Sequence, residues 1–244
     1  MPFTLAHPAI VLPLKFLPKK WISLTALIVG SVMPDLESFI KLRPEKNFSH
    51  TWEGFLYLGI PAGLLLSFFF HNVIRDPLIT NLPAFLQKRY SKFIGFNWTE
   101  RFRKHWPVVI VSLIIGGASH FFWDSFSHPR SWFMSFFPQL RGNITRPDGT
   151  LQEIPYLIQY INTILGVLII FYFVVKMPAN QPVIYSRYFI PFWIIAFVVA
   201  IAIFAVRMDL LIDNSLDGLI ITFVSAILFG LCTAALIFGK SQPL

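Results

Sequence analysis

Charged residues are scarce in this sequence of 244 residues, since Asp, Glu, Lys and Arg make up 13% of it and hydrophobic residues 55%. About a quarter of the residues in a typical soluble domain are charged. A water-soluble core of this size could not cover so much apolar side-chain surface. The composition therefore excludes a soluble fold and indicates an integral membrane protein.

Cysteine is almost missing as well. The single residue, Cys232, lies inside an apolar run, so an intramolecular disulfide is excluded and we interpret Cys232 as a buried packing residue. Internal repeats and low-complexity segments are not evident. The first twenty residues are interrupted by prolines and contain no small-residue cleavage site, so we expect no cleaved secretory signal.

Long apolar runs, in contrast, are plentiful. Six stretches are long enough, or nearly so, to cross a hydrocarbon layer of about 30 Å. They are Trp21–Ile40, Gly54–Ile74, Pro107–Phe126, Tyr156–Val175, Tyr188–Val206 and Leu216–Phe238. The sequence therefore predicts an all-α integral membrane protein, a bundle of about six transmembrane helices.

Basic residues are concentrated in the connection between the second and third stretches. It contains Arg75, Lys88, Arg89, Lys92, Arg101, Arg103 and Lys104. Cytoplasmic loops are enriched in Lys and Arg, so we expect this connection and both termini in the cytoplasm of a multi-pass protein of the inner (cell) membrane. The basic residues responsible for the net charge of +8 would then contact membrane lipids with anionic headgroups, and we expect no nucleic-acid partner.

The same connection has an amphipathic pattern between Leu82 and Phe96, where Leu, Phe, Tyr and Ile alternate with Lys and Arg. This pattern predicts an interfacial helix with its positive face on anionic lipid. The alternative is a polar loop that only carries topology charges.

Ionisable residues at membrane depth are energetically costly, so each of them suggests a functional site. Asp35 and Glu37 follow Pro34, which interrupts the first stretch and frees backbone carbonyls, and together they offer oxygen ligands for a cation. The alternative is a helix that ends at Pro34 and leaves both carboxylates in headgroup water. His50 precedes the second stretch and is a possible ligand, whereas Glu53 suits the first helical turn.

The third stretch holds the most informative pattern. His120 and Asp124 are four residues apart and share one face of a helix, and His128 follows after another four. An imidazole and a carboxylate one turn apart in an apolar helix favour a metal or proton site over a packing role. The small residues from Gly116 to Ser119 would let a neighbouring helix approach closely.

These polar residues should meet on one side of the membrane, because the first and third stretches end where the second begins. We therefore predict a site for one or two divalent ions, with zinc expected. The ligands are Asp35, His50, His120 and Asp124, and Glu37 or His128 is a further ligand or a general base. His7 would join them only if Ala9 to Leu17 entered the membrane as a short re-entrant segment, which the spacing permits but does not require.

At these residues the sequence resembles the predicted membrane-bound metal-dependent hydrolases of bacteria, a group that includes a LexA-regulated inner-membrane member. It resembles still more closely an uncharacterised bacterial family with an N-terminus like Met-Pro-Phe-Thr-Leu-Ala-His-Pro. The matching elements, all within residues 1–130, are His7, Pro34-Asp35-Leu36-Glu37, Ser49-His50-Thr51 and Ser119-His120 through Asp124. The resemblance implies that His7 is a further metal ligand and that the reaction is a hydrolysis.

The sequence departs from that pattern at two places. Glu37 stands where a second Asp is usual, and no His-Arg-Gly triplet precedes His50. The long connection after the third stretch combines aromatic residues with three arginines that could bind a substrate phosphate, or that could be ordinary interfacial residues. These are Arg130, Arg141 and Arg146.

Residues 1–130 should form the half that carries the metal site. Residues 131–244 should supply the outer loop and three further helices of the same folded unit. The function expected from these features is hydrolysis of an ester or phosphoester, with a lipid as one possible substrate, at the membrane surface. The alternative is a non-enzymatic membrane protein, either a scaffold or a metal- or proton-coupled transporter, although the last three stretches lack the polar path that transport requires.

Overall fold

The fold was obtained as a computed structural model, and it describes residues 4–44, 48–209 and 215–239. Helices dominate the described residues. The shorter ones are α1 (Pro8–Val11), α2 (Leu24–Val32), α3 (Leu36–Lys41), α4 (Trp52–Gly54), α5 (Ile60–Phe69), α6 (Arg75–Thr80), α7 (Ala84–Tyr90) and α9 (Trp132–Phe136). The longer ones are α8 (Trp98–Asp124), α10 (Ile154–Val175), α11 (Phe189–Asp209) and α12 (Leu216–Phe238). Strands β1 (Asn143–Thr145) and β2 (Leu151–Glu153) form an antiparallel hairpin.

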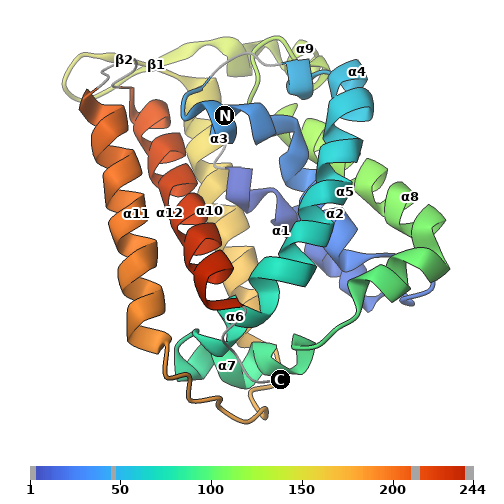
Figure 1. The fold of residues 1–244 in the computed structure, drawn as a ribbon. Helices are drawn as coiled ribbons and strands as arrows, with labels where there is room; N and C mark the ends of the chain where they lie inside the picture. Colours follow the sequence, from blue (N-terminus) through green and yellow to red (C-terminus); the bar gives the residue numbers. More distant parts are fainter. Residues whose placement is uncertain (1–3, 45–47, 210–214, 240–244) are drawn as a thin grey trace. The chain divides into compact units, whose positions relative to one another are not determined.

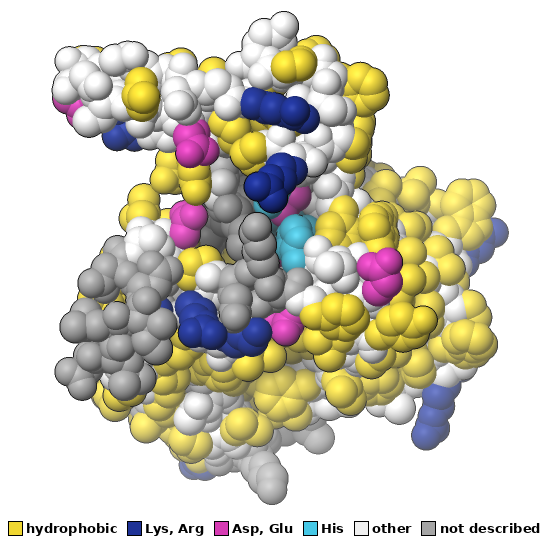
Figure 2. Space-filling model, turned by 90° about the horizontal axis from the view of Figure 1, so that it is seen from above, with side chains coloured by type: hydrophobic (Ala, Val, Ile, Leu, Met, Phe, Trp, Pro, Cys, Tyr) yellow, Lys and Arg dark blue, Asp and Glu magenta, His cyan; other side chains and the backbone are white. Residues whose placement is uncertain are grey.

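Among the described residues, five helices are long and apolar enough to cross a membrane. They are Trp52–Thr80, in which π-helical turns join α4, α5 and α6, and then α8, α10, Phe189–Met208 of α11, and α12. They correspond to five of the six predicted stretches, so the all-α membrane class is confirmed. Large apolar side chains such as Ile164, Phe171, Ile190 and Ile201 are more than half exposed, as lipid-facing residues are. Many side chains on the face shown in Figure 2 are hydrophobic.

The first predicted stretch, residues 21–40, is not one continuous spanning helix. Helix α2 ends at Val32, a 3₁₀ turn follows over Met33–Asp35, and α3 continues from Leu36. Pro34 lies in that turn, and proline cannot donate the backbone hydrogen bond that a continuing α-helix requires. The proline therefore divides the predicted span into two short helices.

Contacts divide the chain into two compact units, each assembled from three separate segments. The first consists of residues 1–34, 51–63 and 107–173, and the second of residues 35–50, 64–106 and 174–244. Each unit combines segments from before and after residue 130, the boundary predicted from the sequence.

In the first unit, α2 packs directly on α8. A Cβ atom added at Gly30 would lie 2.3 Å from the Leu113 carbonyl oxygen, and one added at Gly116 would lie 2.4 Å from that of Leu27. Only glycine permits backbones to approach so closely, as the small residues of the sequence predicted. This contact fixes the position of the C-terminal half of α8, which carries His120 and Asp124.

In the second unit, α11 and α12 lie side by side as an antiparallel pair (Figure 1). Gly230 packs on the Ala196 carbonyl, and the buried core contains Ile74, Phe192 and Ala234. Helix α7 occupies part of the segment predicted as an interfacial helix, and Phe85 on it is 63% exposed, as an apolar face on lipid requires.

Candidate metal centre

His120 and Asp124 lie one turn apart at the C-terminal end of α8, where both side chains are buried. The Nε2 atom of His120 lies 3.5 Å from Oδ2 of Asp124. Asp124 is the last residue of the helix, and its side chain is 5% exposed. A carboxylate removed from water to this extent needs a cation or several hydrogen-bond donors.

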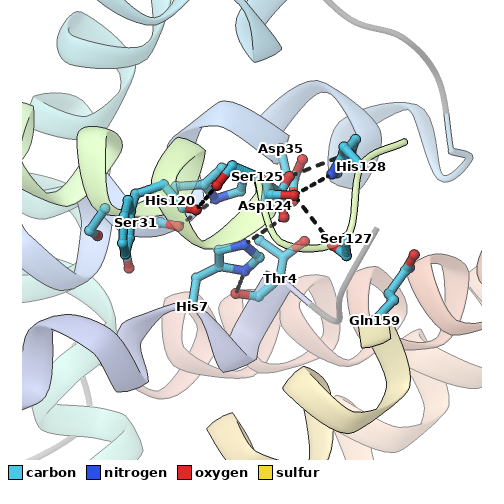
Figure 3. A network of polar contacts seen from close by, with 12 residues as sticks. Thr4, His7, Ser31, Asp35, His120, Asp124, Ser125, Ser127, His128 and Gln159 are labelled. Carbon is cyan, nitrogen blue, oxygen red and sulfur yellow. Dashed lines mark hydrogen bonds and ion pairs between the residues drawn. The ribbon is translucent and has the colours of Figure 1, made fainter. Parts of the chain in front are cut away.

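His7 comes to the same carboxylate from the N-terminal segment. It directly precedes α1 and is 1% exposed, and its Nε2 lies 3.1 Å from Oδ1 of Asp124 (Figure 3). Its ring stacks on that of His120, with centroids 4.0 Å apart and 15° between the planes. The sequence pattern alone left His7 unplaced, whereas the resemblance implied that it joins the site.

A helical N-terminal segment carries His7 into this position. Helix α1 is followed by a 3₁₀ turn over Leu12–Phe16, and Ala6, Ala9 and Val11 are each 1% exposed. Val11 packs with Ile22 and Leu27 in a buried cluster. The N-terminal segment is therefore packed inside the first unit. That residues Ala9 to Leu17 enter the membrane as a re-entrant segment stays a prediction.

Three histidines of this unit orient their rings in the same way, because each donates from Nδ1 to a backbone carbonyl. The acceptors are Thr4 for His7 (3.2 Å), Ser31 for His120 (2.8 Å) and Asp124 for His128 (2.9 Å). A carbonyl oxygen only accepts, so Nδ1 carries the proton in each ring. In the neutral ring Nε2 is then unprotonated and carries the lone pair that binds a metal in metal-ligating histidines.

The three Nε2 atoms converge on the two carboxylate oxygens of Asp124. The third contact, from His128, measures 3.7 Å to Oδ2. Lone pairs of neutral imidazoles and of a carboxylate repel one another, while two stacked imidazolium rings would also repel in a buried site. A single proton satisfies only one such contact, whereas a bound cation satisfies all of them together.

The spacing of the ligand atoms suits a small divalent ion. The ligand atoms of His7, His120 and Asp124 all lie within 4.8 Å of one another. Tetrahedral zinc with bonds of about 2.1 Å would hold its ligand atoms roughly 3.4 Å apart. The distances of 3.1 and 3.5 Å from the two histidines to Asp124 are close to that value.

His128 is the most accessible member of the group. Its side chain is 37% exposed, while those of His7 and His120 are 0% exposed. It follows α8 in a turn, where Ser131 caps α9 and also donates to the carbonyl of Ser125. His128 is thus placed at the edge of the buried trio, with access to water.

Asp35 and His50 form a pair within the second unit. Nε2 of His50 lies 3.7 Å from Oδ1 of Asp35, whose side chain is 2% exposed. The structure therefore brings these two predicted ligands together. That they share an ion with His120 and Asp124 stays a prediction.

Glu37 holds the turn that leads to His50. Its carboxylate accepts a hydrogen bond of 2.7 Å from the backbone N–H of Ser49 and lies 3.6 Å from Nζ of Lys41. The Ser49 hydrogen bond is the main reason why the pKa of Glu37 lies below its ordinary value. That Glu37 serves as a further ligand or as the general base stays a prediction.

The three arginines proposed for phosphate binding are all exposed. Arg146 donates to Gln152 across the β1–β2 hairpin, which ties its guanidinium to the loop itself. A role of Arg130, Arg141 or Arg146 in substrate binding stays a prediction.

Sequence reasoning missed the carbonyls of Thr4 and Ser31, which orient the two buried rings. Every residue has a carbonyl, so the sequence contains no signal for the ones that accept these bonds. Their role emerges only once α2 and the N-terminal segment are packed beside α8.

The fold and this centre define an all-α membrane protein with a buried histidine–carboxylate cluster in its first unit. The chain belongs to the family described as a domain of unknown function (DUF4184), whose family model matches residues 1–237. No curated protein and no solved structure matches the chain. The family description states no activity, so metal binding and hydrolysis are argued from the site.

Proposed function

We propose that this protein is a membrane-bound metal-dependent hydrolase that binds a divalent ion through His7, His120 and Asp124. The observation that carries the proposal is the convergence of Nε2 atoms, whose rings are oriented by carbonyls, on one buried carboxylate. Imidazole and carboxylate ligands suit zinc. Three protein ligands also leave a fourth position for water, which is the pattern of catalytic zinc sites.

The reaction proposed is hydrolysis of an ester or phosphoester. A bound zinc ion would lower the pKa of a coordinated water toward about 7. His128 is placed to take the proton of that water, because its Nε2 faces Asp124 and its side chain reaches solvent. The carbonyls of Thr4 and Ser31 keep the two ligand rings in orientation. Asp35 and His50 offer the same ligand types for a second ion.

The substrate proposed is lipid-like and reaches the site from the membrane surface. Aromatic rings continue from the end of α8 into α9, with Phe122, Phe126, Trp132 and Phe133 in mutual contact. Trp132 is 53% exposed. Tryptophan, which is amphipathic, is enriched at the membrane interface, where an acyl ester or phosphoester is found.

We further propose that the protein lies in the inner membrane with both termini in the cytoplasm. The basis is the group of basic residues from Arg75 to Lys104, which lie at the adjoining ends of two spanning helices and in the connection between them.

The test is the metal content of the detergent-purified full chain, measured by elemental analysis before and after incubation with zinc and removal of the excess. We expect near-stoichiometric zinc in the wild type and its loss in His120→Ala and Asp124→Asn. His105→Ala, at the kink within α8 and outside the cluster, is the control and should keep its metal.

Folded wild-type protein that retains no more zinc than Asp124→Asn would refute the metal centre and favour the scaffold interpretation. If zinc binds as expected, activity is then screened on acyl esters and phosphoesters in mixed micelles. Hydrolysis that disappears in both His120→Ala and Asp124→Asn supports the hydrolase. Metal binding with no hydrolysis of any of these substrates would contradict it.

A further inference from the structure

Arg207 lies in the last turn of the spanning part of α11 and is turned inward. An arginine at the end of a transmembrane helix normally extends its side chain to the headgroup region and remains accessible to water. Arg207 is instead only 5% exposed, although it carries a charge. A guanidinium held in this way requires a specific set of partners.

One of these partners is the carbonyl oxygen of Leu42, just after α3. Nε of Arg207 donates to this oxygen at 3.0 Å, and Oγ1 of Thr222 on α12 donates to it at 3.1 Å. Leu42 has φ 55°, and it is the one non-glycine residue with positive φ in the described part of the chain. This strained backbone is held between α11 and α12, as is common at functional sites.

One nitrogen of the Arg207 guanidinium is left without a partner. Nη2 is fully buried and has no hydrogen-bond partner, and the described residues supply no carboxylate to it. Leaving a buried charged donor unsatisfied costs several kcal/mol. The natural complement of this donor is an anion, which the described side chains do not provide.

A second unsatisfied donor lies on the adjoining face of α12. Ser225 follows Thr222 by three residues and therefore points to the same side of the helix. It is 0% exposed, and its Oγ also lacks a hydrogen-bond partner. Since helical side chains lean toward the N-terminus, Arg207 reaches back toward the level of Phe204, which contacts Phe223. Arg207 and Ser225 thus approach the same level of the α11–α12 pair.

We propose that Arg207, together with Ser225, binds a phosphate group between α11, α12 and the turn after α3. A guanidinium with an unpaired Nη2 donor and a neighbouring hydroxyl is an arrangement that recognises phosphate oxygens. Phosphate is also the anion most abundant at the end of a membrane-spanning helix, in lipid headgroups. The phosphate comes either from a phospholipid headgroup or from free phosphate. This site belongs to the second unit and requires no metal, so it stands independently of the proposed hydrolase.

The test is thermal unfolding of the detergent-purified full chain, titrated separately with inorganic phosphate and with phosphatidylglycerol in mixed micelles. We expect at least one of the two to raise the Tm of the wild type. An effect of phosphatidylglycerol alone identifies a headgroup site, and an effect of inorganic phosphate identifies a free-anion site. Chloride at equal ionic strength controls for screening.

Arg207→Gln should abolish the rise, and Arg207→Lys should retain the charge but bind about tenfold more weakly, because the bidentate fork is lost. Ser225→Ala changes little volume and keeps the fold, and should also weaken the response. Arg187→Gln, at an exposed position before α11, is the matched control and should respond as the wild type does.

A wild-type Tm that neither probe raises would overturn the proposal. The proposal would also be overturned if Ser225→Ala and Arg207→Lys both showed the same rise in Tm as the wild type. Because the Ser225→Ala and Arg207→Lys variants are conservative, the result does not depend on whether Arg207→Gln folds.

Discussion

The imidazole of His7 stacks on the imidazole of His120, with ring centroids 4.0 Å apart and an angle of 15° between the planes. The two rings belong to segments at opposite ends of the first half of the sequence. They are parallel because each is fixed by its own backbone carbonyl, from Thr4 and from Ser31. The stack therefore presents two Nε2 atoms side by side to Asp124, an arrangement that suits one shared cation.

Replacing His7 with alanine should remove one of the three ligands and leave the other two in place. Loss of a residue that merely orients a ligand costs 10- to 100-fold in metal affinity, so loss of a ligand should weaken zinc binding by at least about 100-fold. The measurement is a competition titration with a chromophoric chelator. His128→Ala should change zinc affinity less than His7→Ala, because His128 lies at the edge of the trio. If the two variants bind equally, the assignment of His7 as a ligand is wrong.

Replacing Gly116 with alanine should disturb the metal centre from a distance. The added Cβ would lie 2.4 Å from the Leu27 carbonyl oxygen and 2.9 Å from the Ser31 nitrogen, so α2 and α8 must move apart. Such overpacking typically costs about 1–3 kcal/mol. Since the carbonyl of Ser31 orients His120, zinc affinity should fall together with the Tm.

Gly142→Ala is the control for this substitution, because the nearest atom to its added Cβ lies 3.4 Å away. It should change stability by less than about 0.5 kcal/mol and leave zinc binding unchanged. A Gly116→Ala variant with wild-type Tm and zinc affinity would show that the close contact of α2 and α8 does not position the site.

The spacing of His120 and Asp124 could be predicted from the sequence, because four residues are close to one turn of a helix. The five spanning helices could be predicted for a similar reason, since their apolar length exceeds what a soluble core needs. The break at Pro34 could also be predicted, because proline cannot donate the backbone hydrogen bond of a continuing helix. That a second short helix, α3, follows directly was not predicted from the apolar composition.

Contacts between distant segments could not be predicted in the same way. His7 reaches Asp124 through the folded path of the N-terminal segment, and only the family resemblance suggested it. The inward orientation of Arg207 depends on a backbone carbonyl at Leu42, whose positive φ has no sequence signal in a leucine. Periodicity reports which face of a helix is apolar, but not which distant backbone atom will face it.

Glu37 should make the stability of the protein depend on pH in the acid range. The Ser49 N–H holds the pKa of this carboxyl below its ordinary value of 4.5 in the folded state. A group with a depressed pKa contributes stability above its unfolded pKa and loses that contribution as the pH falls through the folded value. The Tm of the wild type should therefore fall more steeply below about pH 4.5 than that of Glu37→Gln. Parallel pH profiles for the two proteins would contradict this role.

Arg75 should be a stabilising residue of the second unit, although it lies outside both proposed sites. It is 4% exposed, donates to the Phe96 carbonyl at 2.7 Å and contacts Nδ1 of His71 at 3.0 Å. Its Nε also pairs with Asp76, and through its bond to Phe96 Arg75 connects the segment before α8 to the start of α6. Arg75→Met removes these donors and leaves the buried acceptors unsatisfied, which should cost about 2–4 kcal/mol. Thermal unfolding measures the loss, and the exposed Arg103→Met should stay within about 0.5 kcal/mol of the wild type.

Because zinc would bind in the other unit, the Arg75→Met protein that remains folded at low temperature should still bind zinc with wild-type stoichiometry. Loss of zinc from that folded protein would mean that the stability of the second unit controls the metal centre of the first.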